Sequence, residues 1–106
     1  MLTNRIALIT GAANGIGESI ARIFAQYGAF VAVSDLNENS CHEVVKILKN
    51  SEKHMGIEVD VTNKKSITNA IEKMKEKFGK PPDIVVNSAG IINRVSLRFE
   101  LNLDLL

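Results

Sequence analysis

The chain has 106 residues, 45% of them apolar and 24% charged, which is enough for one compact globular domain. Its 13 Lys and Arg residues nearly balance 12 Asp and Glu residues, so charge gives no basis for binding nucleic acid or an anionic membrane. No apolar run approaches the roughly 20 residues that span a bilayer, and the first residues lead into a strand-like segment rather than a secretory leader.

Four short apolar runs predict four β-strands; the first is continuous, as expected for a strand buried on both faces, and the third has the weakest pattern. They are residues 5–10, 30–35, 55–59 and 83–87. Because a segment of helical period follows each of the first three runs, right-handed crossovers predict a parallel sheet with helices on both faces. The expected fold class is therefore α/β, a truncated Rossmann-type doubly wound sheet of about four strands in the order 3-2-1-4, with three helices.

Three segments have the apolar period of an amphipathic helix. The first ends at Gly28, the second covers about residues 39–50, and the third has Thr62 as its N-cap and Gly79 just beyond its end. The expected buried faces are Ile16, Ile20, Ile23, Phe24 and Tyr27 in the first helix, Val44, Val45, Ile47 and Leu48 in the second, and Ile67, Ala70, Ile71, Met74 and Phe78 in the third.

The pattern changes after residue 92, so we expect a nucleotide-binding half-domain at residues 1–92 and a divergent tail at residues 93–106. Apolar and polar residues alternate in the tail, which fits an amphipathic strand as well as a loop, and Val95, Leu97, Phe99 and Leu101 fall on one side. An uncovered edge at the fourth strand would be an aggregation hazard. The hypothesis is that the tail pairs with that edge.

Three glycines, Gly11, Gly15 and Gly17, separate the first strand from the first helix. Backbone N–H groups and the positive end of a helix bind a diphosphate at a distance that side chains would block. Gly11 permits a tight turn, Gly15 lets the backbone approach the ligand, and Gly17 lets the helix pack close to the sheet. A plain glycine-rich turn is the alternative, and the position between a buried strand and an amphipathic helix favours the phosphate site.

Asp35 stands at the carboxyl end of the second strand, 18 residues beyond Gly17. A carboxylate there accepts both hydroxyls of an adenosine ribose and repels a ribose 2′-phosphate. No Lys or Arg stands at residues 11–17 or 34–39 to neutralise such a phosphate. The residues therefore predict NAD, as NAD(H), in preference to NADP. The alternative is a capping or turn aspartate.

Three segments, together with Asp35, resemble the short-chain dehydrogenase/reductase family over residues 3 to about 91. TGAANGIG at residues 10–17 looks like its T-G-x-x-x-G-x-G loop, DVT at 60–62 like its D-V-[TS] element, and NSAG at 87–90 like its N-N-A-G motif, with Ser88 replacing the second Asn. The resemblance implies a dinucleotide site made of Gly11, Ala13, Asn14, Gly15, Ile16, Gly17, Asp35, Leu36, Asp60, Val61, Asn87, Ala89 and Gly90. In the family, Asp60 would meet the adenine amino group, Ala89 and Gly90 would lie near the adenosine ribose, and Asn87 would help hold the central strands.

The family transfers a hydride between nicotinamide and a carbonyl carbon, so the resemblance implies interconversion of a ketone and a secondary alcohol. Residues 33–36 and 80–91 look most like 3-oxoacyl-[acyl-carrier-protein] reductases and 17-beta-hydroxysteroid dehydrogenases of the family. A 3-oxoacyl thioester or a steroid is thus the implied substrate. Family members usually form dimers or tetramers, and a related reductase subunit is an implied partner.

The family's acid/base is a tyrosine followed four positions later by a lysine. A free tyrosine, with a pKa of about 10, is a poor base at neutral pH, so the neighbouring cation is a physical requirement. The one tyrosine, Tyr27, has Val31 at that position, and we expect it in the core. No residue is therefore predicted to be catalytic, and we expect this chain to be inactive by itself. The alternative is an inactive truncated isoform that serves as a dinucleotide-binding or subunit-interaction module.

The remaining polar residues predict no further site. His42 and His54 have no ligand at metal-binding spacing, and we expect both at the solvated surface. The single Cys41 excludes an internal disulfide, is expected to be partly buried and unreactive, and favours the cytoplasm or the mitochondrial matrix. A phospho-receiver domain is rejected because it needs acidic residues after the first strand, where Thr10 and Gly11 stand.

Overall fold

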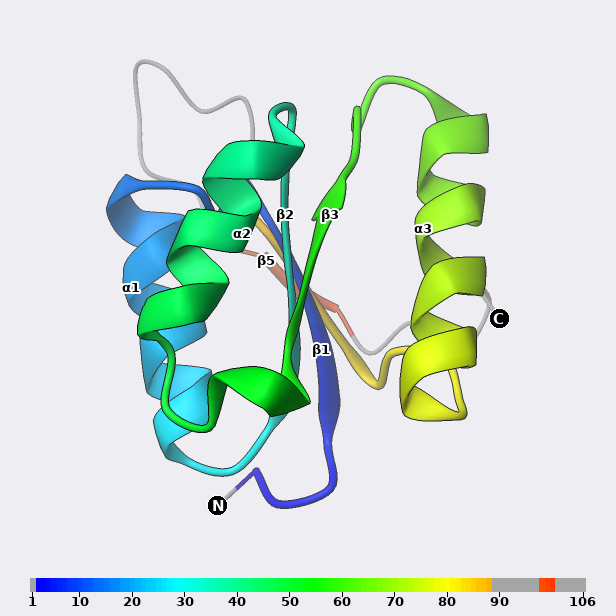
Figure 1. Ribbon diagram of the computed structural model, residues 1–106. Coiled ribbons are helices and arrows are strands. Elements are labelled where there is room, and N and C mark those ends of the chain that lie inside the picture. Colours follow the sequence, from blue (N-terminus) through cyan, green and yellow to red (C-terminus); the bar gives the residue numbers. More distant parts are fainter. Residues whose placement is uncertain (1, 89–97, 101–106) are drawn as a thin grey trace.

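A computed structural model describes residues 2–88 and 98–100 of the chain (Figure 1). One sheet has the order β3-β2-β1-β4-β5, in which the first four strands are parallel and β5 runs antiparallel to β4. The elements are, in chain order, β1 (Ile6–Thr10), α1 (Gly15–Gln26), β2 (Phe30–Asp35), α2 (Glu38–Ile47), the 3-10 helix η1 (Ser51–Lys53), β3 (Met55–Glu58), α3 (Lys64–Phe78), β4 (Ile84–Asn87) and β5 (Arg98–Glu100). The predicted α/β class, the order 3-2-1-4 of the parallel strands and the three helices are confirmed.

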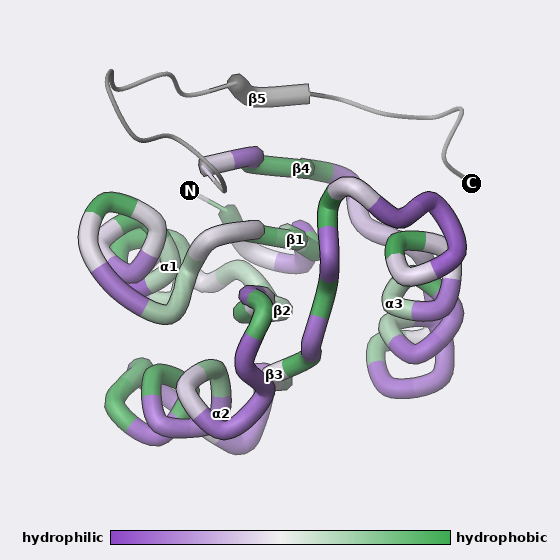
Figure 2. Tube along the Cα trace, turned by 90° about the horizontal axis from the view of Figure 1, so that it is seen from above, coloured by the Kyte–Doolittle hydropathy of each residue, from purple (hydrophilic) through white to green (hydrophobic). Residues whose placement is uncertain are grey.

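Helices cover both faces of the sheet, α1 and α2 on one face and α3 on the other (Figure 2). Strand β1 lies between β2 and β4 and is buried along its whole length. Its side chains alternate between two cores, because Ala7 and Ile9 pack on the side of α1 and α2 whereas Ile6 and Leu8 pack on the side of α3. The uninterrupted apolar run of β1 is needed because each face of the strand has its own core.

Helix α1 packs on the sheet through small residues. Gly17, Ala21 and Ala25 recur every four residues and are buried, so the helix backbone lies close to the strands. Ile20 and Phe24 flank this stripe and are half-buried against the same core. The predicted buried positions of these two larger side chains are therefore confirmed in part.

The other three side chains of the predicted α1 face are exposed. Ile16 and Ile23 lie at the surface, and Tyr27 is 48% exposed, so its expected core position is wrong. The large apolar residues predict the wrong side of α1 to face the sheet. The side that faces the sheet consists of glycine and alanine. The helix needs small residues where its backbone approaches the strands.

Helix α2 starts after the N-cap Asn37, whose side chain accepts a backbone N–H from the first turn at 3.0 Å. Its span, Glu38–Ile47, is shorter than the predicted residues 39–50 at the C-terminal end. Val44 and Leu48 are buried as predicted and Val45 is half-buried, but Ile47 is exposed. The prediction for Ile47 fails because this residue lies on the outer side of the last turn.

Helix α3 is the element whose pattern was the most regular, and its buried stripe is confirmed. Its N-cap is Asn63 rather than the predicted Thr62, because the Asn63 side-chain oxygen accepts the N–H groups of Lys65 and Ser66 at 2.9 and 3.2 Å. Gly79 ends the helix with φ +87°, as predicted. The stripe consists of buried Ala70, Ile71 and Met74 with half-buried Ile67 and Phe78.

Strand β5 covers the outer edge of β4. The antiparallel register places Val85 opposite Glu100 and Asn87 opposite Arg98. The hypothesis that the tail pairs with this edge is thereby confirmed for the backbone of residues 98–100. The rest of the predicted tail, at residues 93–97 and 101–106, lies outside the described residues, and the boundary at residue 92 stays a prediction.

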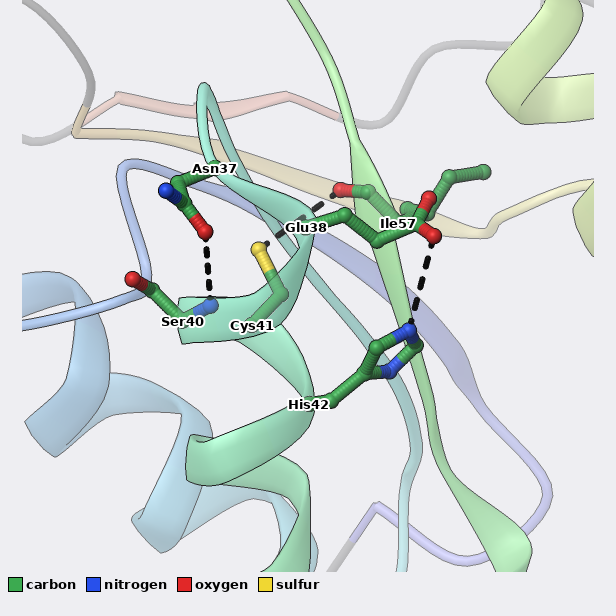
Figure 3. A network of polar contacts seen from close by, with 6 residues as sticks. All are labelled: Asn37, Glu38, Ser40, Cys41, His42 and Ile57. Carbon is green, nitrogen blue, oxygen red and sulfur yellow. Dashed lines mark hydrogen bonds and ion pairs between the residues drawn. The ribbon is translucent and has the colours of Figure 1, made fainter.

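Helix α2 and strand β3 are in close contact around Cys41 (Figure 3). Cys41 is fully buried rather than partly buried as expected, and its thiol donates to the Ile57 carbonyl at 3.7 Å. Burial, and next the charge of Asp35, raises the pKa of the Cys41 thiol to about 11. The thiol therefore stays protonated at neutral pH, which agrees with the predicted lack of reactivity. His42, on the next position of α2, lies at the surface as predicted.

His54 is buried, which contradicts its expected surface position. It is 5% exposed, its Nδ1 accepts the Val31 N–H at 3.0 Å, and its Nε2 lies 2.9 Å from the Lys49 carbonyl. The neutral ring with a proton on Nε2 satisfies both contacts. Burial lowers the pKa of His54 below its usual value. The polar neighbours in the sequence hide this burial, which arises only because η1 brings the ring against β2.

We expect the free energy of unfolding to fall as the pH is lowered from 7.5 to 5. The unfolded chain takes up a proton at His54 near pH 6.5, whereas the folded chain resists it to lower pH. The contribution of His54 is thus complete above that value and is lost on acidification. His54→Gln keeps a side-chain acceptor for Val31 and removes the titrating ring, so it should reduce the pH dependence measured by urea unfolding.

The matched control is His42→Gln, which changes the exposed histidine and should retain the pH dependence of the parent chain. A His54→Gln variant whose stability varies with pH as much as the parent's would contradict this account of the buried ring.

Candidate functional site

The predicted site residues follow the ends of four parallel strands, which share the upper edge of the sheet in Figure 1. Gly11 follows β1, Asp35 ends β2, Asp60 follows β3 and Asn87 ends β4. The chain first adds β2 and β3 on one side of β1 and then crosses to place β4 on the other side. Ligands of open parallel α/β sheets bind at the edge where the strand order reverses in this way.

The loop between β1 and α1 uses glycine where the backbone requires it. Gly11 has φ +65° and Gly15 has φ +61°, a region that residues with a side chain adopt at a cost. No heavy atom outside its neighbours lies within 4 Å of the place where a Cβ of Gly15 would stand. The outer side of the loop is therefore open at Gly15, as its predicted role requires.

Gly17 is needed for packing rather than for its backbone angles. A Cβ at Gly17 would overlap the Gly11 carbonyl oxygen and would lie 2.7 Å from the Ser88 hydroxyl oxygen. The first turn of α1 is thus pressed against both the start of the loop and the end of β4. This contact agrees with the close packing predicted for Gly17.

The start of α1, which follows the loop, has no side-chain cap. Asn14 is the N-cap residue, but its side chain makes no capping hydrogen bond. An N-cap side chain usually satisfies one of the first free N–H groups of a helix. The N-terminus of α1, where Ile16 is exposed, therefore has the donors and the dipole that suit an anion.

Asp35 connects the end of β2 to the glycine loop. Its Oδ2 accepts the Ala13 N–H at 3.0 Å, and its Oδ1 accepts the Leu36 N–H at 2.7 Å. The Ala12 N–H also donates to the Ser34 carbonyl at 2.9 Å. Because a carboxylate oxygen has two lone pairs, each oxygen of Asp35 retains capacity for a further donor. Leu36 is exposed beside it.

Asp60 is held in a local turn at the end of β3. Its Oδ1 accepts the N–H and the hydroxyl of Thr62 at 2.9 and 2.6 Å, and these two bonds lower the pKa of the Asp60 carboxyl. The Val59 N–H donates to the Asp35 carbonyl at 2.8 Å, which places this turn next to the end of β2. Val61 is half-buried on the core under α3. The contact of Asp60 with an adenine amino group stays a prediction.

Two consecutive residues join the end of β4 to β1. The Thr10 hydroxyl donates to the Asn87 side-chain oxygen at 2.9 Å, in agreement with the predicted role of Asn87 in holding the central strands. The Ser88 hydroxyl and N–H both donate to the Thr10 carbonyl, at 2.6 and 3.3 Å. Ala89 and Gly90 lie outside the described residues.

The sequence-based prediction missed Thr10 and Ser88 as members of this edge. In the sequence, Ser88 is a departure from one family motif and Thr10 is part of another. No sequence spacing predicts that the hydroxyl of Ser88, after β4, donates to the carbonyl of Thr10, at the end of β1. The signal exists only in the parallel register of β1 and β4.

An open hollow of about 310 Å³ lies between α1 and α2, next to the glycine loop. Its charged side chains are two carboxylates, Glu18 from α1 and Glu43 from α2, and Ala13 of the loop forms part of its wall. Within the described residues, no group of three or more His, Cys, Asp or Glu side chains is arranged to hold a metal ion. In the same part of the chain, no helix has the length and apolar character needed to cross a membrane.

A parallel sheet with a glycine loop at its reversal point and an acidic residue at the end of the second strand defines a Rossmann-type α/β protein. The sequence profile of the short chain dehydrogenase family matches residues 5–104, so the chain belongs to this family. Its members use nicotinamide dinucleotide cofactors and small-molecule substrates.

Several family members are similar to the chain along most of its length. Secoisolariciresinol dehydrogenase from Forsythia intermedia is 41% identical over 90 residues, which cover 85% of the chain and 32% of that protein. 3-Hydroxyacyl-CoA dehydrogenase type-2 from Drosophila melanogaster is 38% identical over 95 residues, 90% of the chain and 36% of that protein. The crystal structure of a hydroxysteroid dehydrogenase from Escherichia coli superposes with a TM-score of 0.78 at 36% identity, covering 85% of the chain and 38% of that structure. The chain thus spans about a third of the length of these relatives.

We expect Gly17→Ala to destabilise the chain more than Gly15→Ala. The new Cβ of Gly17→Ala overlaps a backbone carbonyl, and this overpacking destabilises the folded chain by about 3 kcal/mol. The higher helix propensity of alanine offsets only about 1 kcal/mol of this loss. Gly15→Ala meets no atom and costs about 1 kcal/mol for its positive φ alone. Urea unfolding of both variants measures the difference, and equal stabilities would contradict the packing role of Gly17.

Proposed function

We propose that the carboxyl edge of the sheet binds NAD(H), and that the described residues form the nucleotide-binding portion of a short-chain dehydrogenase/reductase. The observation that carries the proposal is the 3.0 Å bond between the Asp35 carboxylate and the Ala13 N–H. This bond joins the carboxylate that we propose for the ribose to the loop that we propose for the diphosphate. When bound, the nicotinamide supplies or accepts the hydride that interconverts a ketone and a secondary alcohol.

The residues present fit a dinucleotide. A Cβ would block the close packing at Gly17, the space beside Gly15 is open, and the N-terminus of α1 has no cap from Asn14. These features give a diphosphate access to backbone N–H groups and to the positive end of the helix dipole. The proposed contacts are Gly11, Ala13, Asn14, Gly15, Ile16 and Gly17 for the diphosphate, Asp35 and Leu36 for the adenosine ribose, Asp60 and Val61 for the adenine, and Asn87, Ala89 and Gly90 for the remaining edge near the ribose.

The charges around the proposed ribose position support NAD over NADP. Asp35 accepts ribose hydroxyls and repels a 2′-phosphate. The hollow next to Ala13 adds Glu18 and Glu43 and no Lys or Arg to its lining. Glu18 and Glu43 are paired with Arg22 and Lys46, so the proposed preference rests on Asp35, which has no cation from residues 11–17 or 34–39 beside it to pair with a 2′-phosphate.

The names of two similar proteins support the substrate class implied by the sequence. One acts on a 3-hydroxyacyl-CoA and the other on a hydroxysteroid, and both substrates are secondary alcohols. We therefore propose a 3-oxoacyl thioester or a steroid as the substrate of the whole protein. The free buried thiol of Cys41 is in keeping with a reducing compartment, the cytoplasm or the mitochondrial matrix.

The proposed reaction needs an acid/base that these 106 residues do not supply. Tyr27 is at the surface near the end of α1, and the residue four positions later is the buried, uncharged Val31 of β2. No lysine at that position lowers the pKa of the tyrosine hydroxyl or holds a ribose. Because these residues contain no Tyr-x-x-x-Lys pair, a second candidate function for them is a module that binds the dinucleotide or a partner subunit without catalysis of its own.

We expect NADH to bind at least about tenfold more tightly than NADPH, because Asp35 repels the extra phosphate of NADPH. A tenfold ratio corresponds to about 1.4 kcal/mol of binding free energy. Asp35→Ala should erase this preference, because it removes both the ribose acceptor and the repulsion. Glu52→Ala is the control, since Glu52 is an exposed carboxylate of η1 at the opposite end of β3. Fluorescence titration of each variant with both cofactors measures the ratio, and equal affinities in the parent chain would defeat the role of Asp35.

The chain should bind NADH without oxidising it when a 3-oxoacyl thioester or a ketosteroid is added. The reference is Gly15→Asp, which places a carboxylate in the open space of the glycine loop and blocks the cofactor. The rate of NADH loss at 340 nm should be the same for both proteins. A ketone-dependent rate above that of Gly15→Asp would overturn the claim that the acid/base is missing.

A further inference from the structure

Ser88 makes two hydrogen bonds to a single carbonyl at the base of the glycine loop. Its hydroxyl donates to the Thr10 carbonyl at 2.6 Å, and its N–H donates to the same oxygen at 3.3 Å. That carbonyl belongs to the peptide that joins Thr10 to Gly11. Ser88 therefore fixes the orientation of the peptide plane from which the loop leaves the sheet.

Gly11 does not set this orientation by itself. Glycine adopts positive and negative φ about equally readily, so the φ of +65° at Gly11 has to be selected by neighbouring groups. The Gly11 carbonyl is packed against Gly17 on one side of the loop, and the Ser88 hydroxyl lies 2.7 Å from the Cβ position of Gly17. Ser88 thus contacts both ends of the loop, its first peptide and the first turn of α1.

We infer that Ser88 is a positioning residue for the dinucleotide: it holds the Thr10–Gly11 peptide so that the glycine loop presents its N–H groups to the diphosphate. The inference rests on the proposed function and adds a residue to it. Without the hydroxyl, only the longer N–H bond of 3.3 Å holds the Thr10–Gly11 peptide. The peptide then samples other orientations, and only a fraction of the chains has a loop ready for the ligand. The apparent dissociation constant rises in inverse proportion to that fraction.

The structure provides a matched control in Ser34. The Ser34 hydroxyl donates to the Ile9 carbonyl at 2.9 Å, so it makes the same kind of bond one residue earlier on β1. Ser88→Ala and Ser34→Ala each delete one hydroxyl-to-carbonyl bond, but only the first of these bonds holds the peptide of the loop. The Ser34 carbonyl, which accepts the Ala12 N–H, is unchanged by Ser34→Ala.

Urea unfolding first confirms that each variant is folded. Each folded variant is then titrated with NADH in the absence of urea, and NADH fluorescence gives the dissociation constant. Ser88→Ala should raise the dissociation constant about tenfold, the loss typical of one hydrogen bond to a polar group, and Ser34→Ala less than about twofold. Ser88→Thr retains the hydroxyl and should stay within about threefold of the parent chain. Equal losses in Ser88→Ala and Ser34→Ala, or a Ser88→Thr variant as weak as Ser88→Ala, would overturn the inference.

Amide hydrogen exchange without cofactor separates this inference from the proposed function. Exchange at residues 12–17 should be faster in Ser88→Ala than in the parent chain and unchanged in Ser34→Ala. A parent chain that binds no NADH would refute the proposed function, and the exchange rates would still decide whether Ser88 orders the loop. Unchanged exchange in Ser88→Ala would overturn the inference whatever the affinity.

Discussion

The close approach of Gly17 to the Gly11 carbonyl is the constraint on which the rest of the structure depends. With a side chain at Gly17, α1 would have to move away from the loop, because the Cβ would overlap that carbonyl. The approach is continued by the small residues Ala21 and Ala25, which keep the whole helix close to β1 and β2. It also aims the N-terminus of α1 at the edge where four strands end. The anion-binding role that we propose for that edge thus depends on how tightly one helix packs.

The strand pattern was predictable because it rests on local features. Uninterrupted apolar runs mark strands with two covered faces, and the helical segments between them leave few ways to order a parallel sheet. Where the prediction failed, the deciding contact was tertiary. The period of the large apolar residues predicts Tyr27 in the core, but small residues form the buried side of α1. The polar neighbours of His54 predict it at the surface, but η1 brings its ring against β2. The N-cap was misplaced by one residue because Thr62 and Asn63 are both good caps.

The common edge shared by the predicted site residues could be predicted from the strand order, whereas the contacts between them could not. Glycine spacing and the position of Asp35 after the second strand predict a phosphate loop and a ribose acceptor from the sequence alone. The bond from Ala13 to Asp35 depends on the path of the loop, and the bonds from Ser88 to Thr10 depend on the register of β1 and β4. Both are contacts between residues far apart in the chain. Spacing rules describe residues along one element, and they carry no information about such pairs.

The most direct test of the central claim, that the carboxyl edge of the sheet binds a dinucleotide, is an NMR titration of the ¹⁵N-labelled chain with NADH. The account predicts chemical-shift changes concentrated in the amides of residues 11–17, Leu36, Val61 and Asn87. These amides lie on the loop or beside the four strand ends. Changes confined to the groove between α1 and α2 around Ile47 and Lys49, with the glycine loop unaffected, would contradict it.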